Sequence, residues 1–279
     1  MVGDMGQKLR RGFGMATARL RILPDFIIIG AQRSGTTSLF KYLAAHPAIY
    51  PATFKEVHFF DRFFNRGVGW YRSFFPIALQ RWYVTQVQRR AFVSGEATPY
   101  YLFHPRASER VAALLPHVKL IAILRNPIDR AYSQYYHEVQ RGLESASFEA
   151  ALQRERELLD NEQAALQADP AYYSALHQNH AYLARGRYVE QLRVWRQHFP
   201  REQLLVLQSE AFYADPADSV AQVVDFLGLP SFHLREFKKY NEMQYAEMPA
   251  AVRVALQDYF HPYNQQLYAY LGVDWAWEP

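Results

Sequence analysis

The sequence predicts an α/β fold in three layers, with a central, mainly parallel sheet flanked by helices. Three apolar runs, at residues 26–29, 119–124 and 204–207, have the length and composition of buried strands. A segment with helix signals follows each run. Strands that alternate with helices are typical of a parallel sheet that is covered on both faces.

The helix signals are specific in position. Residues 38–45 form an apolar helical pattern that ends before Pro47. Asn126 suits an N-cap and Pro127 suits the first helical position, so we expect a helix over about 128–137. Two further helices are predicted from a stripe at one helical spacing (Tyr188, Leu192, Trp195 and Phe199) and from an Asp-Pro start with an apolar inner face (Asp215, Pro216, Val220, Val223, Val224 and Leu227).

Length and composition allow one large domain. The chain has 279 residues, of which 50% are apolar or aromatic and 21% are charged, so a sizeable core is expected and general disorder is not. We expect a basic N-terminal lead over 1–21, frayed or lying on the surface, and a single domain over 22–279. A charged helical stretch at about 141–185 interrupts the alternation, either as a solvated helix face or as a cover for an acceptor site.

Charge and cysteine content limit the function classes. A formal net charge of +4 suits an anionic ligand but is too small to predict nucleic-acid binding by itself. The absence of cysteine excludes disulfides, thiolate metal sites and cysteine nucleophiles. We find no apolar run long enough to cross a bilayer and no signal-peptide pattern in residues 1–21, so we expect a cytoplasmic protein without a membrane span.

The segment between the first strand and the first helix has the composition of an anion-binding loop: Gly30, Ala31, Gln32, Arg33, Ser34, Gly35, Thr36 and Thr37, followed by Ser38. Backbone N–H groups in such a loop converge on an anion, and the helix N-terminus adds partial positive charge. The spacing is P-loop-like, but Thr36 stands where a P-loop has lysine, and the nearest cation is Arg33. The alternatives are a turn that only packs the helix, and a surface role for Arg33.

The second strand ends in a cation. P-loop NTPases usually place a magnesium-binding carboxylate near this point, whereas this chain has Arg125. Ser133 follows eight residues later, about two helical turns away. Arg125 and Ser133 therefore predict a second phosphate group that is bound without a metal, and we predict no metal site. The alternatives are an ion pair between Arg125 and Asp129 and an ordinary helix position for Ser133.

Together the two motifs resemble those of the sulfotransferases that use 3′-phosphoadenosine 5′-phosphosulfate (PAPS). Residues 26–38 resemble their 5′-phosphosulfate loop and residues 124–133 their 3′-phosphate motif. The likeness is greatest to the heparan-sulfate N- and 3-O-sulfotransferase branch and its bacterial relatives, and it covers most of residues 26–229. It implies transfer of a sulfuryl group from PAPS to a hydroxyl or amine of an acceptor, foremost a carbohydrate, with release of PAP.

The resemblance also implies roles for individual residues. Arg33 takes the position of the family's loop lysine and would stabilise charge on the leaving oxygen. Glu56 matches the catalytic glutamate and would act as the general base, with His58 as the second candidate and His104 as a weaker one. From the residues alone, Glu56 is equally a solvated partner of Lys55. The residues expected to bind the nucleotide are Arg33, Ser34, Gly35, Thr36, Thr37, Ser38, Arg125 and Ser133.

Two departures from the family pattern are visible. The 3-O branch has a catalytic lysine where this chain has Ala97, within the segment Glu96-Ala97-Thr98-Pro99. The family's C-terminal nucleotide loop has no clear match, and residues 238–241 are either its counterpart or a solvated basic turn. Five aromatic residues are candidates for sugar stacking, although core packing is the commoner role: Trp70, Tyr71, Trp82, Tyr100 and Tyr101.

Two other functions use the same motifs. A P-loop NTP-dependent kinase would explain the loop, but Thr36 and Arg125 are both unfavourable for it. A non-catalytic binder of anionic nucleotides or RNA would explain the basic balance, but we find no basic stripe with interleaved aromatic residues. We therefore expect an acceptor molecule, foremost a saccharide, as the partner, and no nucleic acid. The oligomeric state is not specified by the sequence.

Overall fold

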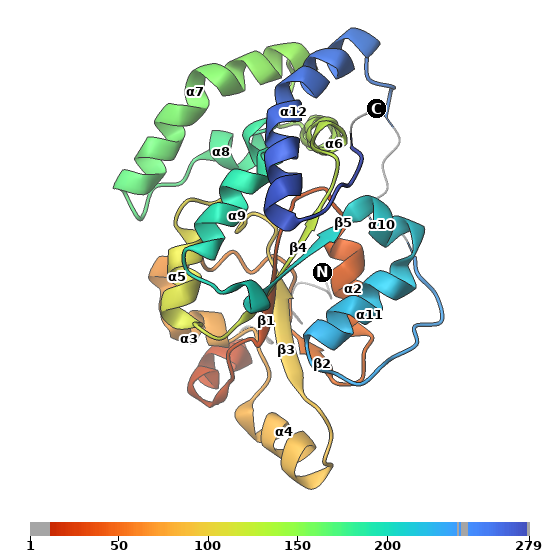
Figure 1. Ribbon diagram of the computed structural model, residues 1–279. Coiled ribbons are helices and arrows are strands. Elements are labelled where there is room, and N and C mark those ends of the chain that lie inside the picture. Colours follow the sequence, from red (N-terminus) through yellow and green to blue (C-terminus); the bar gives the residue numbers. More distant parts are fainter. Residues whose placement is uncertain (1–11, 239, 241–244, 278–279) are drawn as a thin grey trace.

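The structure is a computed structural model that describes residues 12–238, 240 and 245–277. Within these residues the chain forms a parallel five-stranded sheet with the order β2-β3-β1-β4-β5 (Figure 1). The strands are β1 (Phe26–Gly30), β2 (Ile49–Pro51), β3 (Val93–Ala97), β4 (Lys119–Leu124) and β5 (Leu204–Gln208). The predicted α/β class, with a parallel sheet flanked by helices, is confirmed.

The strands β1, β4 and β5 match the three apolar runs to within one residue, whereas β2 and β3 were not predicted. β2 has only three residues, and β3 has the sequence Val-Ser-Gly-Glu-Ala, which lacks an apolar run. β3 nevertheless lies beside β1, with Gly95 opposite Phe26. A Cβ atom on Gly95 would lie 2.3 Å from the Phe26 ring, so the small residue is what lets the two strands pack.

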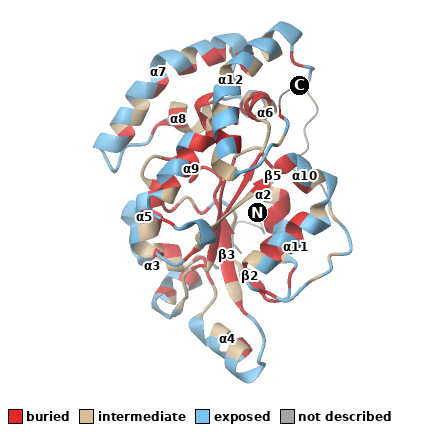
Figure 2. Ribbon diagram, viewed as in Figure 1, coloured by how far each residue is buried: buried red, intermediate tan, exposed pale blue. Residues whose placement is uncertain are grey.

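Each face of the sheet has its own helical layer, because successive strand residues point to opposite sides. Phe26 and Ile28 face α2 (Thr36–Ala44), α10 (Ser209–Ala214) and α11 (Pro216–Phe226). Ile27 and Ile29 face α3 (Gly67–Arg72), α5 (Ala107–Leu114), α9 (Tyr188–Arg196) and the end of α12 (Ala250–Leu271). The three central strands, β1, β3 and β4, are accordingly buried along most of their length, whereas the edge strands β2 and β5 are mostly half-buried (Figure 2).

The remaining elements surround this core. The stretch at 141–185 contains two helices, α7 (Phe148–Ala168) and α8 (Ala175–Asn179), and α7 packs with α6 (Pro127–Gln140) and α12 in a separate apolar cluster. At the opposite end, α4 (Ala78–Trp82) continues into a π-helical turn (Tyr83–Val87). Single 3-10 turns lie at Ala18–Leu20, Phe64–Arg66, Ala184–Gly186 and Arg201–Gln203. Among the described helices, none has the combined length and apolarity that a bilayer span requires.

The sheet topology determines where a ligand can bind. β1 lies between β3 and β4, and the chain leaves it for β2 on one side before returning to β4 on the other. In open parallel sheets, this reversal opens a crevice at the carboxyl ends of the strands. The loops that follow β1 and β4 therefore lie at one edge, and they are the two predicted phosphate-binding motifs.

We predict that Gly95→Ala lowers the free energy of unfolding by about 1–3 kcal/mol, because the added methyl group overlaps the Phe26 ring in a packed core. The matched control is Gly69→Ala in α3, where a Cβ would meet no atom within 4 Å. This control should be neutral or stabilising by up to about 1 kcal/mol. Urea unfolding followed by circular dichroism measures both, and equal effects would contradict the packing argument.

Candidate active site

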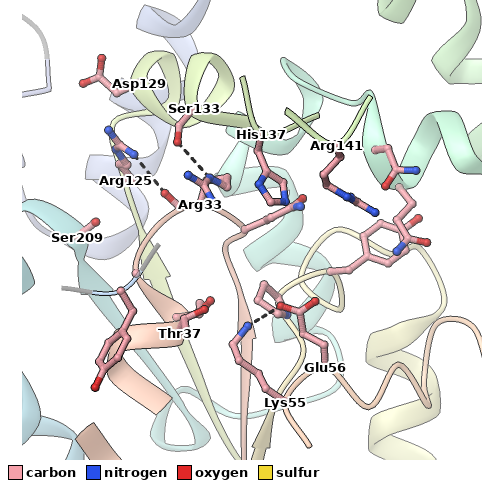
Figure 3. Close-up of a pocket in the computed structure, with 18 of the residues that line it drawn as sticks. Arg33, Thr37, Lys55, Glu56, Arg125, Asp129, Ser133, His137, Arg141 and Ser209 are labelled. Atoms are coloured by element: carbon pink, nitrogen blue, oxygen red, sulfur yellow. Dashed lines mark hydrogen bonds and ion pairs between the residues drawn. The ribbon is translucent and has the colours of Figure 1, made fainter. Parts of the chain in front are cut away.

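A cavity of about 810 Å³ lies at the carboxyl edge of the sheet (Figure 3). Its volume is within the range of natural small-molecule sites. Its walls come from the loop after β1, the segment that contains residues 55–62, α6, the end of α8 and α10. The polar and charged side chains among them are Gln32, Arg33, Thr36, Thr37, Lys55, Glu56, His58, Arg62, Arg125, Asp129, Ser133, His137, Arg141, Gln178, Asn179, Ser209 and Glu210.

The loop after β1 is shaped by Gly35. Its φ is +107°, a left-handed conformation that an L side chain rarely adopts, and a Cβ atom here would lie 3.1 Å from the Tyr213 hydroxyl. Gly35 caps α2 without a side-chain hydrogen bond, and Thr36 and Thr37, which begin the helix, line the cavity. The N-terminus of α2, which carries partial positive charge, thus lies at the cavity, where it favours a ligand of negative charge.

Two arginines from the two sequence motifs meet beside this loop. Arg33 Nε donates to Ser133 Oγ of α6 at 3.1 Å, and Arg125 Nη1 donates to the Arg33 carbonyl at 3.3 Å (Figure 3). Burial, and then the nearby Arg125 charge, lower the pKa of Arg33. Two cations held this close in a partly buried site repel each other, and a bound anion would relieve that repulsion.

The helix that carries Ser133 is fixed from several sides. The Asn126 side chain accepts a hydrogen bond from Ile128 N at 3.0 Å, as its predicted N-cap role requires. The Tyr188 hydroxyl donates to the Arg125 carbonyl at 2.8 Å. Asp129 pairs with Arg253 of α12 at 2.7 Å. The carboxylate considered as the partner of Arg125 is therefore engaged by another cation.

The predicted nucleotide-binding residues divide into two groups. Arg33, Gly35, Thr36, Thr37, Arg125 and Ser133 line the cavity, whereas Ser34 and Ser38 do not. Ser34 is fully buried, and its Oγ has no hydrogen-bond partner within the described part of the chain. Ser38 Oγ accepts from Tyr240 N at 3.2 Å. Of the C-terminal segment 238–241, Lys239 and Asn241 lie outside the described residues, and Tyr240 lines the cavity.

Glu56 lies across the cavity from the arginines, between two cationic groups. Lys55 Nζ lies 2.5 Å from Glu56 Oε1, and His58 Nε2 lies 3.7 Å from Glu56 Oε2. Burial opposes ionisation of Glu56, but the interactions with His58 and Lys55 outweigh it and lower its pKa to about 2. The carboxylate therefore stays ionised at neutral pH, and its side chain remains 47% exposed to the cavity and solvent.

His58 is held between two carboxylates. Its Nδ1 lies 2.5 Å from Asp61 Oδ2, opposite the contact that its Nε2 makes with Glu56. Burial would lower the pKa of His58, but Asp61 and then Glu56 raise it to about 10. The imidazole is therefore protonated at neutral pH. Sequence reasoning missed Asp61, whose one available signal was its position three residues after His58.

The buried carboxyl group of Glu96 forms a hydrogen-bond network beside the segment that contains Glu56 and His58. Glu96 of β3 is fully buried and accepts hydrogen bonds from Tyr71 at 2.6 Å and from Thr98 at 2.7 Å. Burial raises its pKa to about 7, even though both hydrogen bonds oppose that rise. The Tyr101 hydroxyl contacts Glu96 at 3.3 Å and accepts from Phe59 N at 2.8 Å. Glu96 is thereby connected to the backbone beside His58, and sequence reasoning did not predict this role.

Besides the side with Arg33 and Arg125 and the side with Glu56, the cavity has a third wall, which contains Arg62, His137, Arg141, Gln178 and Asn179. Buried Arg185 connects this wall to the loop after β1, because it donates to Gln32 Oε1 and to the backbone carbonyls of His177 and Gln178. Burial lowers the pKa of Arg185 to about 10. Gln32 and Gln178 are thus fixed by one side chain, and sequence reasoning singled out neither of them.

Most of the aromatic candidates for sugar stacking lie elsewhere. Tyr71 and Tyr101 are fully buried around Glu96, and Trp70 packs against the apolar core. Trp82 is exposed on α4, at the other end of the molecule. Tyr100 lines the cavity. His104, the weakest base candidate, is buried and is not among the residues that line the cavity.

Comparison with known proteins places these features in one family. A sequence model of the sulfotransferase domain matches residues 23–254. Heparan sulfate glucosamine 3-O-sulfotransferase 3B1 from Mus musculus is 29% identical over 282 residues, which cover 92% of this chain and 65% of the mouse protein. This chain therefore spans slightly less than two thirds of that relative. A human bifunctional heparan sulfate N-deacetylase/N-sulfotransferase 3 is 34% identical over 225 residues, 77% of this chain and 23% of that protein.

A solved structure agrees in fold and in extent. The sulfotransferase from Alicyclobacillus acidocaldarius superposes with a TM-score of 0.69 and 32% sequence identity, and the match covers 92% of this chain and 99% of that chain. The strand order, the cation-rich loop and the domain match lead to the same assignment. The chain belongs to the sulfotransferase domain family, as the two sequence motifs predicted.

Proposed function

We propose that the chain transfers a sulfuryl group from PAPS to a hydroxyl or amine of a carbohydrate, with Glu56 as the general base. One observation carries this proposal: a single cavity holds two arginines at a helix N-terminus and, across from them, an ionised carboxylate. A donor with two phosphate-type groups suits the first side, and an acceptor that must lose a proton suits the second. Membership of the sulfotransferase family supports the same reaction.

The residues around the loop fit the nucleotide. The uncapped N-terminus of α2 and the Arg33 guanidinium would hold the 5′-phosphosulfate, because both offer donors in a partly buried place. Arg125 and Ser133 would hold the 3′-phosphate from the opposite side. The repulsion between Arg33 and Arg125 would favour the binding of a strongly anionic ligand. PAPS supplies the sulfuryl group together with a leaving group, PAP, whose phosphate oxygen accepts the electrons of the broken bond.

Glu56 is suited to act late in the reaction. A carboxylate with a pKa near 2 is a weak base toward a free hydroxyl group. The acceptor proton becomes far more acidic as the new S–O or S–N bond forms, and it can then pass to Glu56. The old S–O bond breaks at the same time, and Arg33 lies where it would stabilise the charge that develops on the leaving oxygen. The proposed transfer is in line and needs no metal ion.

In this proposal the positive charge of His58 holds the Glu56 carboxylate in place. Its protonated imidazole cannot accept a proton, so we assign it the positioning of Glu56 and not the role of base. Asp61 would keep the imidazole charged and oriented.

A saccharide acceptor is supported by the relatives, two of which are named for sulfation of heparan sulfate. The cavity lining supports it as well, because Gln178 and Asn179 of the third wall provide amide groups and Tyr100 provides an aromatic group that suit a sugar ring. Arg62 and Arg141 add positive charge beside them. The enzyme is tested with labelled PAPS against a panel of charged and neutral oligosaccharides, with the sulfated product identified by mass spectrometry.

We predict that Arg125→Ala weakens PAP binding about 10- to 100-fold, because it removes a charge-assisted contact to phosphate. Calorimetry in EDTA measures the affinity, and PAP should raise the melting temperature of the wild type in the same buffer. The control is Arg193→Ala, which removes an exposed arginine of α9 outside the cavity. Equal affinity in Arg125→Ala and the wild type would refute the assigned phosphate contact.

We predict that Glu56→Gln keeps PAP affinity within about twofold but lowers turnover about 10²- to 10⁴-fold, because the amide preserves shape and cannot take the proton. Single-turnover kinetics with labelled PAPS separates the chemical step from binding. Glu190→Gln, a change at an exposed glutamate of α9, serves as the control. A near-normal rate in Glu56→Gln would move the base to another residue.

Stability should depend on the charge of His58. Its pKa in the folded chain, about 10, is above the ordinary value of 6.5, so protonation favours the folded state. This contribution is complete below about pH 6.5 and is lost as the pH rises through about 10. The difference in unfolding free energy between the wild type and His58→Gln should therefore shrink from pH 6 to pH 10. Urea unfolding across this range measures it, with His198→Gln as the control, and a constant difference would contradict the ion-pair geometry.

A further inference from the structure

A group of exposed apolar side chains lies at the opposite end of the molecule from the cavity. There α4 and the π-helical turn project beyond the amino ends of the strands (Figure 1). Leu79, Trp82, Tyr83 and Val87 are all exposed on this projection. Residues 79, 83 and 87 are spaced by four and residue 82 adjoins them, so the four side chains form one stripe. We call this projection the 78–90 projection.

The projection is anchored to the sheet. Val84, on its inner side, is buried. Arg81 forms an ion pair with Asp25, and the same Asp25 carboxylate accepts from Ser94 N at 2.7 Å. Because Asp25 precedes β1 and Ser94 belongs to β3, the projection is held against two strands. Its apolar stripe is therefore a fixed feature of the folded surface.

A second exposed apolar segment lies beside it. Arg21 pairs with Ile77 in an isolated bridge, and Gly14 packs directly against Ser73. Both segments therefore rest on residues 73–77. Five of the six most exposed large apolar side chains in the described chain, at 53–66% exposure, belong to these two segments: Phe13, Leu20, Leu79, Trp82 and Val87. Such clustering marks an interaction surface, since scattered apolar residues need no explanation.

The charge around these segments is one-sided. Within the described part of the chain, residues 12–24 and 77–95 contain five arginines and not a single Asp or Glu. Arg19, Arg89 and Arg90 are exposed next to the apolar stripes. Exposed positive charge therefore lies beside the exposed apolar and aromatic side chains of these two segments.

We propose that this surface, formed by residues 13–20 and the 78–90 projection, docks on the face of a bilayer that contains anionic phospholipids. Trp and Tyr are favoured at the boundary between headgroups and acyl chains, and arginines near them pair with lipid phosphates. The segment projects from the rest of the molecule (Figure 1), which suits insertion into a deformable headgroup layer. Binding of this kind is peripheral, because it combines a small apolar insertion with electrostatic attraction to the lipid surface.

The fold then determines how the molecule stands on the membrane. The projection precedes β3 and lies at the amino edge of the sheet, whereas the cavity lies at the carboxyl edge. A molecule docked by the projection therefore directs the cavity away from the bilayer, toward the aqueous phase. Docking would leave the cavity open to a water-borne acceptor.

The test is co-flotation of the purified chain with vesicles of neutral phosphatidylcholine, alone or with about 30% phosphatidylserine. We expect binding to the anionic vesicles only, with loss at high salt since screening weakens surface attraction. Trp82→Ser combined with Val87→Ser should reduce the bound fraction at least about tenfold, because it removes the inserted apolar groups. Arg89→Gln combined with Arg90→Gln should also reduce the bound fraction. Adding Trp82→Ser and Val87→Ser to this variant should reduce the bound fraction further.

The control is Val254→Ser, which removes an equally exposed apolar side chain from α12 and should leave vesicle binding unchanged. Unchanged melting temperatures in all variants establish that they fold. Failure of the wild type to bind anionic vesicles would overturn the proposal. The proposal would also be overturned if Trp82→Ser with Val87→Ser left vesicle binding intact, because attraction by charge alone would then explain it. It would equally be overturned if the wild type dimerised in sedimentation experiments and the same variant abolished the dimer, because the occupant would then be a second copy of the chain.

Discussion

The contact between Arg33 and Ser133 is the interaction on which the site depends. It joins residues that are 100 positions apart, one in the loop after β1 and one in the helix after β4. The contact places Arg33 beside Arg125 at the cost of repulsion between like charges. The sheet, the cap at Asn126 and the hydrogen bond from Tyr188 hold the two arginines together without a ligand. Because the site is already arranged, an anion that binds there would lose little binding free energy to rearrangement of the protein.

The side of the cavity that contains Glu56 depends on a different interaction, the hydrogen bonding of the buried Glu96 carboxyl group. Glu96 has hydrogen bonds from Tyr71 and Thr98, yet its pKa rises to about 7 because it is fully enclosed. A group held in this way is sensitive to the loss of any partner, since a buried polar atom without a partner is costly. This network fixes the backbone near His58 through Tyr101. The position of Glu56 is thus determined by residues that an acceptor does not touch.

Which elements could be predicted from the sequence depends on the distance along the chain over which each signal acts. Local signals predicted β1, β4 and β5 and the helices after them, because apolar runs and caps act within a few residues. β3 escaped prediction, since Gly95 is favoured there by its fit against Phe26, a contact across 69 positions that no local pattern contains. The two phosphate motifs were recognisable because loop and helix signals surround them. Asp61, Glu96 and Arg185 were not, because burial and long-range hydrogen bonds define their roles.

Arginine appears at both ends of this molecule, and geometry decides what it does there. In the cavity, Arg33 and Arg125 are partly buried, converge on one place and are restrained by hydrogen bonds, an arrangement that suits a small, highly charged group. On the 78–90 projection, Arg89, Arg90 and Trp82 are all exposed. Dispersed charge of that kind suits an extended anionic surface better than a single ligand. Since the two sets lie at opposite edges of one sheet, the proposed docking surface and the cavity could be occupied at the same time.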